Sequence, residues 1–149
     1  MFADLLKRLT QPNPVPLPDN DARLALSALL VRVARADGHF DADERGLILK
    51  IAQTRFDLTA AAAEDLLKNA EILESEAPDT VRFTRAIKDA VPFEDRTAII
   101  ESLWQVVLAD GVRDDAEDSL LRMVANLLGI NDRDSALARQ RVENRGKTP

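Results

Sequence analysis

The chain has 149 residues, of which 46% are apolar and 31% charged, a composition typical of one globular domain and not of a disordered chain. It contains no cysteine, which excludes disulfides, thiolate catalysis, zinc–cysteine sites and iron–sulfur clusters. The formal net charge of −6 repels phosphate backbones, so we expect no nucleic-acid partner.

Residues 1–20 are predicted to form a short helix and a linker ahead of the main domain. Phe2, Leu5, Leu6 and Leu9 share one helical face, for which packing on the body is a simpler explanation than a docking role. Alternating prolines predict a stiff, extended segment over Gln11–Pro18. The start is too short and charged for a secretory signal, so we expect a cytoplasmic chain. No apolar run is long enough to span a membrane, and peripheral association with one stays open.

The sequence predicts a series of helices in the first half of the domain. From Asp21 a densely apolar segment predicts a helix that is buried most of the way round and ends at Gly38. Asp41 begins an amphipathic helix, Thr59 caps the next one, and Pro78 opens a further helix.

The second half repeats this order. Pro92 marks a new start, followed by a second densely apolar helix that Gly111 ends. Asp114 begins another amphipathic helix, Gly129 stops it, and Asn131 caps a last helix. No alternating β-branched run interrupts these segments, so the sequence predicts an all-α bundle of seven to eight helices.

The two halves are related by an internal duplication with an offset of 73 residues. Residues 29–52 align with residues 102–125, and the shared unit places an acidic turn between a buried helix and an amphipathic one. We predict two helical hairpin repeats, about 22–75 and 93–145, related by a pseudo-twofold within a domain spanning 21–145. The aligned turn residues are Ala36-Asp37-Gly38 with Ala109-Asp110-Gly111, Asp41 with Asp114, and Glu44 with Glu117.

This paired turn, with Arg96 early in the second buried helix, resembles the TerB-like family, which is named for tellurite resistance. Related units occur in the N-terminal domain of DjlA-type co-chaperones, and the resemblance covers residues 22–140. It implies an all-helical fold, acidic residues that bind a metal cation, and a role in stress-response or membrane-associated assemblies. It implies no established reaction.

Two interpretations of the acidic turns stay open. Asp41 and Asp114, each with a glutamate three residues later, are fully explained as helix N-caps. Asp37 and Asp110 are different, because each is expected in the last turn of a buried helix, where the partial negative charge of the helix end disfavours an acid. Either each Asp accepts backbone N–H groups across its turn, or the repeated exception marks a functional site.

If the carboxylates converge near the pseudo-twofold, they form a metal site of Asp37, Glu44, Asp110 and Glu117. An all-oxygen cluster suits Ca²⁺, Mg²⁺ or Mn²⁺ as the cofactor and not zinc. The loops lack the ligand spacing of an EF-hand. His39 has no counterpart in the second repeat and is expected to be a turn residue.

The sequence does not contain a recognisable set of catalytic residues. The sequence contains no glycine-rich phosphate loop, and no serine has a plausible His/Asp partner set. We therefore predict a non-enzymatic binding module with a protein partner. An adaptor whose acidic turns are only caps is the alternative, and a hydrolase that uses the carboxylates as acid and base is a third.

The C-terminal segment is the one candidate for a basic patch. Acidic residues interrupt it and no aromatic side chain is available for base stacking, so it reads as a solvated helix face. Its basic residues are Arg133, Arg139, Arg141, Arg145 and Lys147.

Overall fold

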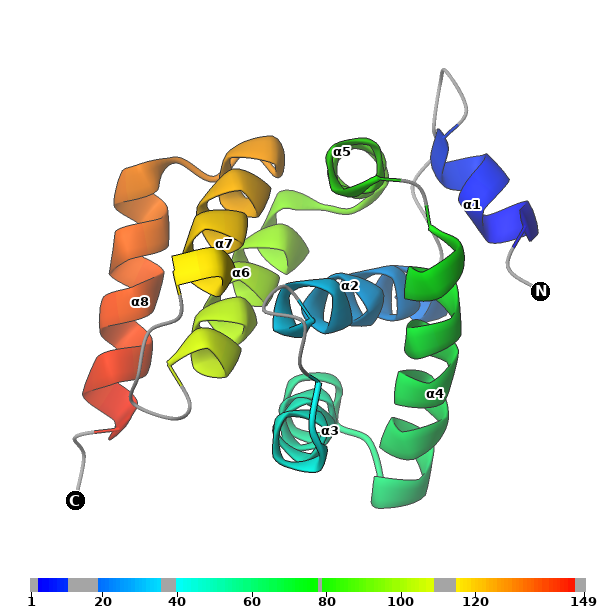
Figure 1. The fold of residues 1–149 in the computed structure, drawn as a ribbon, viewed down its shortest axis with the longest axis horizontal. Coiled ribbons are helices and arrows are strands. Elements are labelled where there is room, and N and C mark those ends of the chain that lie inside the picture. The colour runs from blue at the N-terminus through cyan, green and yellow to red at the C-terminus, as the bar shows by residue number, and fades with distance from the viewer. Residues whose placement is uncertain (1–2, 11–18, 36–39, 78, 109–114, 147–149) are drawn as a thin grey trace.

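The computed structural model describes residues 3–10, 19–35, 40–77, 79–108 and 115–146. Within these residues the chain forms eight helices and no strand, which confirms the all-α fold class (Figure 1). The helices are α1 (Ala3–Thr10), α2 (Asp19–Ala34), α3 (Ala42–Phe56), α4 (Ala60–Glu76), α5 (Thr80–Ala90), α6 (Phe93–Val107), α7 (Asp115–Leu127) and α8 (Asp132–Gly146).

The helix boundaries follow the predicted duplication. Adding 73 to the bounds of α2 gives 92–107, and α6 covers Phe93–Val107. The same shift carries α3 onto 115–129, where α7 lies, and α4 onto 133–149, where α8 lies. Each set of equivalent helices thus contains three members, α2–α4 and α6–α8, and α5 connects the two sets.

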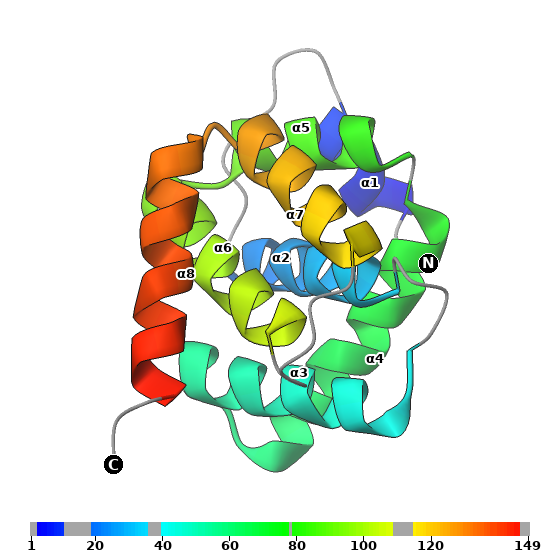
Figure 2. The same cartoon turned by 60° about the vertical axis from the view of Figure 1, so that its left-hand side comes forward.

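The helix contacts obey the same symmetry. In the first repeat α2 packs on α3 and α4, and in the second α6 packs on α7 and α8. Between the repeats α2 packs on α6, while α2 also contacts α7 and α6 contacts α3 (Figure 2). A pseudo-twofold exchanges these last two contacts, so its axis passes between α2 and α6.

The two central helices, α2 and α6, provide almost half of the buried apolar residues in the described part of the chain. Their apolar residues occur on nearly every face, and both helices are enclosed by the other elements (Figures 1 and 2). Trp104 of α6 is only 3% exposed, as predicted for a core residue. The fully enclosed positions of these helices are Ala25, Ala28, Leu29, Val31, Val33 and Ala34 in α2 and Ile100, Ser102 and Leu103 in α6.

Local hydrogen bonds explain where the outer helices begin. The side chain of Asp41 accepts a hydrogen bond from the amide three residues later at 2.8 Å and thereby caps α3. Thr59 caps α4 in the same way at 3.1 Å. Asn131 caps α8 in the same way at 2.8 Å. These caps were predicted. The cap of α5 is Asp79, which sequence analysis did not single out.

The short helix α1 packs against α5, and its Leu5 is 4% exposed. This confirms the packing interpretation of that helix. The proline-rich segment 11–18 and the expected stops at Gly38 and Gly111 lie outside the described residues, as do Pro78 and Asp114.

Candidate functional site

Of the four predicted metal ligands, the structure places one. Glu44 lies half-buried in the first turn of α3. Asp37 and Asp110 lie outside the described residues, as does the side chain of Glu117, although α7 includes its backbone. Among the residues that the structure does describe, no three His, Asp or Glu side chains are grouped as a metal site requires. Asp37 and Asp110 are not among these residues.

The predicted capping role of Asp41 is confirmed. Its carboxylate accepts the amide of Glu44 at 2.8 Å, which satisfies one of the amides that a helix start leaves without a partner. Asp41 therefore has a structural function at the acidic turn, as sequence analysis expected. Its equivalent, Asp114, lies outside the described residues.

Arginines on both sides of the first acidic turn bind carboxylates of α4. Arg35, which follows α2, lies 3.3 Å from Glu74. Arg45, next to Glu44, lies 2.6 Å from Glu64 and 2.7 Å from Glu71. The hydrogen bonds that Arg45 donates to Glu64 lower the pKa of that carboxyl. The bonds to Glu64 and Glu71 in turn raise the pKa of Arg45. These cations stabilise the packing of α4, a role that sequence analysis missed because the three carboxylates are far from their partners in sequence.

The helices that flank one acidic turn pack against the helices that flank the other. The first turn joins α2 to α3, and the second joins α6 to α7. Both α2 with α7 and α6 with α3 are in contact. Each central helix is therefore packed beside the amphipathic helix that follows the acidic turn of the other repeat.

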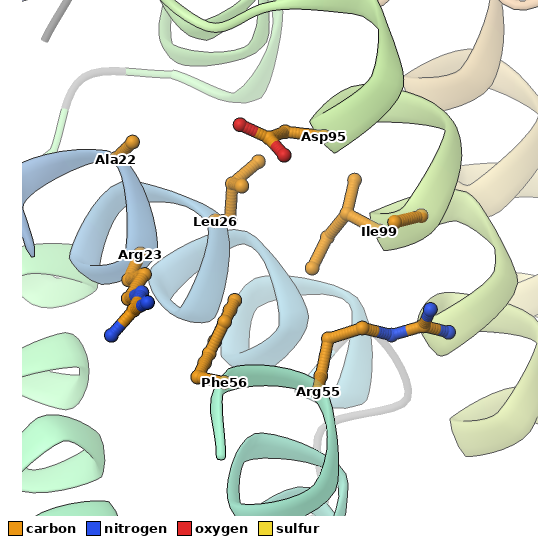
Figure 3. A pocket seen from close by; sticks show the side chains of 8 residues that line it. Ala22, Arg23, Leu26, Arg55, Phe56, Asp95 and Ile99 are labelled. Carbon is orange, nitrogen blue, oxygen red and sulfur yellow. The ribbon is translucent and has the colours of Figure 1, made fainter. Parts of the chain in front are cut away.

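A cleft of about 320 Å³ lies between the N-terminal halves of α2 and α6 and the C-terminal end of α3 (Figure 3). Sequence analysis did not predict it. The duplication could have indicated this cleft, because several of its lining residues are equivalent under the 73-residue offset, such as Leu26 and Ile99. Its lining residues are Ala22, Arg23, Leu26, Arg55, Phe56, Asp95, Ala98 and Ile99.

A buried carboxylate binds the outer helices to α6. Glu101 is 8% exposed, and its oxygens lie 3.9 Å from Arg55 of α3 and 3.4 Å from Arg141 of α8. Arg139 lies 3.1 Å from Glu143 and over the ring of Trp104. Two arginines of the C-terminal segment, Arg139 and Arg141, thus pair with the protein's own carboxylates.

No helix within the described residues combines the length and apolar character needed to cross a bilayer. A search of curated proteins and a search of solved structures found no match. A family model described as Tellurite resistance protein TerB matches residues 23–140, which include both acidic turns and all six repeat helices except the ends of α2 and α8.

Proposed function

Because this chain belongs to the TerB family, we propose that it is a non-enzymatic binding module that holds a divalent cation through its two acidic turns. The family is not a known enzyme family. The proposed ligands are the carboxylates of Asp37, Glu44, Asp110 and Glu117.

The ligand chemistry selects the class of cation. Four carboxylates without histidine or cysteine offer only hard oxygen donors, which suit Ca²⁺, Mg²⁺ or Mn²⁺. Without a cation, like charges brought together at helix ends repel one another. A bound divalent cation offsets that repulsion, so metal binding and folding stability are coupled.

The packing between the repeats is the observation that carries this proposal. Since α2 contacts α7 and α6 contacts α3, the two helices that lead into the acidic turns lie against the helices that carry Glu117 and Glu44. This arrangement favours convergence of the four carboxylates. The pairing of Arg35 and Arg45 with α4 also supports it, because these neighbouring cations are directed toward other carboxylates.

Thermal unfolding tests the proposal directly. A cation that binds only the folded state raises stability by RT ln(1 + [L]/Kd), or about 2.7 kcal/mol at a hundredfold excess over Kd. We expect the melting temperature of the EDTA-treated chain to rise with Ca²⁺, Mg²⁺ or Mn²⁺ and to fall again with chelator.

Substitutions at the unusual aspartates separate a metal site from a pair of caps. We expect Asp37→Ala and Asp110→Ala to abolish the cation response, with a metal-free stability equal to or above that of the wild type. Asp89→Ala, an exposed position on α5, is the matched control and should keep the response. A cation-independent melting temperature, with each turn variant destabilised by about 1 kcal/mol, contradicts the proposal and assigns the turns to capping.

The alternative is an adaptor or scaffold for another protein, in which the acidic turns only cap helices. The confirmed cap at Asp41 favours this alternative. Under either function we propose action in a cytoplasmic stress-response assembly with a protein partner. Affinity capture followed by mass spectrometry, compared between wild type and the Asp37→Ala/Asp110→Ala variant, identifies the partner and shows whether its binding needs the turns.

A further inference from the structure

A second pocket, of about 360 Å³, lies between α3 and the C-terminal half of α6, and none of its described lining residues is a proposed cation ligand. Arg55 marks one end of this pocket, because its Nε donates to the hydroxyl of Ser102 at 3.2 Å. Figure 3 shows the side chain of Arg55 extending from the end of α3 toward α6. The pocket is lined by Leu47, Lys50, Ile51, Thr54, Arg55 and Gln105.

One face of α3 provides most of this pocket. Lys50 and Thr54 are four residues apart, and so are Leu47 and Ile51, so each pair lies on adjacent turns of the same helix face. Ile51 is buried and Leu47 is half-buried, whereas Lys50 and Thr54 are exposed. The pocket therefore has an apolar floor with polar groups at its rim.

The polar groups at the rim have no partner in the described part of the chain. The side chains of Lys50, Thr54 and Gln105 form no hydrogen bond or ion pair with any described residue. Gln105 is half-buried, so leaving its amide without a partner carries a cost. All three groups can donate hydrogen bonds, and they are thus available to a ligand with several acceptor oxygens.

The charge at this pocket is positive. Arg55 pairs with Glu101 at 3.9 Å, and Glu101 pairs with Arg141 at 3.4 Å. These two arginines and one carboxylate together carry one positive charge, and Lys50 adds a second. None of the described residues that line the pocket is acidic. The pocket therefore favours an anion, and a dianion balances its charge.

The second repeat shows that helix packing does not require polar residues at these positions. Under the 73-residue offset, the three polar positions of α3 correspond to apolar residues of α7, namely Met123, Leu127 and Leu128. Gln105 corresponds to Arg32, whose guanidinium donates to a backbone carbonyl of α4 at 3.0 Å. The equivalent contact between α7 and α2 thus combines apolar residues with an arginine that α4 already binds. The free polar groups are a feature of the first repeat.

From these observations we propose that the pocket between α3 and α6 binds a small phosphate monoester. Its phosphate accepts hydrogen bonds from Lys50, Thr54 and Gln105, and its organic group lies on Leu47 and Ile51. A phosphate monoester carries nearly two negative charges at pH 7, which balance the positive charge of the pocket. A volume of about 360 Å³ is at the lower end of the range for small-molecule sites, which fits a ligand of this size.

Titration with phenyl phosphate, followed by ¹H–¹⁵N NMR, tests this proposal. The chain is treated with EDTA, so that a phosphate bridged by a metal ion does not contribute and the result is independent of the proposed cation site. We expect saturable shifts of the Gln105 side-chain amide and of the backbone amides of Lys50 and Thr54. Phenol, which lacks the phosphate, should cause no such shifts. Tighter binding of the end-blocked peptide acetyl-Ala-phosphoserine-Ala-amide would assign the pocket to a protein partner and overturn the proposal.

Variants of the rim decide whether the shifts come from this pocket. We expect Lys50→Met to weaken phenyl phosphate binding about tenfold or more, because it removes a charged hydrogen bond. Thr54→Val removes a neutral one and should weaken binding about threefold. Lys68→Met, at an exposed position on α4, is the matched control and should bind as the wild type does.

Two results would overturn the proposal. One is the absence of a saturable shift with phenyl phosphate, and the other is binding by Lys50→Met as tight as that of the wild type. Since Met123 already occupies the equivalent position of α7, we expect Lys50→Met to keep the fold. A melting temperature equal to that of the wild type excludes unfolding as the cause of a loss.

Discussion

Single residues decide how the outer helices end. α3 and α7 are equivalent in sequence, but their left-handed residues, Asp57 and Gly129, are not at equivalent positions. Glycine adopts positive φ without a steric penalty, whereas an aspartate there carries a cost. The position of this residue decides whether an arginine of the preceding central helix reaches the helix end, as Arg96 does, or lies over a ring, as Arg23 does.

Alanine substitutions at two glycines should have opposite effects on stability. Gly129 has φ 79°, and an added Cβ would lie 3.2 Å from Lys88 Cε and 3.3 Å from Arg96 Nη1. We expect Gly129→Ala to lower the free energy of unfolding by about 1–2 kcal/mol. Gly46 lies inside α3 with no atom within 4 Å of an added Cβ, so Gly46→Ala should raise it by about 0.5–1 kcal/mol. Urea unfolding measures both, and a Gly129→Ala variant as stable as wild type would contradict the left-handed assignment.

At the scale of elements, charged contacts position α4 against its neighbours. Arg45 of α3 binds Glu64 and Glu71, and Arg35 at the end of α2 binds Glu74. Half-exposed pairs of this kind add modestly to stability, but they fix which face of α4 meets α2 and α3. The apolar residues Ala63, Leu67, Ala70 and Leu73 of α4 provide the buried side of the same contact.

The Arg45 contacts should make the stability of α3 and α4 depend on pH. Arg45 lowers the pKa of Glu64 below its value in the unfolded chain. The resulting stabilisation is present above the unfolded pKa and is lost as the pH falls through the folded one. We expect Arg45→Gln to be less stable than wild type at neutral pH, with the difference shrinking as the pH falls through the lowered pKa of Glu64.

Urea midpoints of wild type and Arg45→Gln across this pH range provide the measurement. Arg82→Gln is the control, because Arg82 is exposed and forms no side-chain ion pair within the described residues. A stability difference that is constant down to acid pH would show that Arg45 acts through packing and not through its charge.

At the scale of the whole molecule, the two repeats share one core. α2 and α6 pack on each other as well as on their own repeats, so neither repeat encloses its central helix without the other. Small and large apolar residues of both helices are buried together at this contact. We therefore expect the repeats to unfold as one unit.

A core substitution in one repeat should also lower the stability of the other repeat. Leu30 is 1% exposed, and Leu30→Ala should cost about 2–5 kcal/mol. The only tryptophan, Trp104, lies in the second repeat, so its fluorescence reports unfolding there. We expect the fluorescence and circular dichroism transitions of Leu30→Ala to coincide and to shift together in urea. Leu137→Ala, at a 41% exposed position, is the control, and separated transitions would show independent repeats.

The sequence by itself determined the helical class, the 73-residue duplication and the caps at Asp41, Thr59 and Asn131. These features depend on local rules, because apolar periodicity and helix capping involve residues within a few positions of one another. The same locality made Asp37, Glu44, Asp110 and Glu117 recognisable as a repeated acidic pattern. Their convergence on a cation stays a prediction.

Only the tertiary structure decided which helices of one repeat contact helices of the other and where a cleft lies between them. The pairing of α2 with α7 and of α6 with α3, the burial of Glu101 and the cleft between Arg23 and Asp95 all join residues distant in sequence. Such contacts depend on how helix faces pack in space and on where a helix ends. A one-residue difference between α3 and α7 redirected Arg23, and the spacing of apolar residues does not encode that difference.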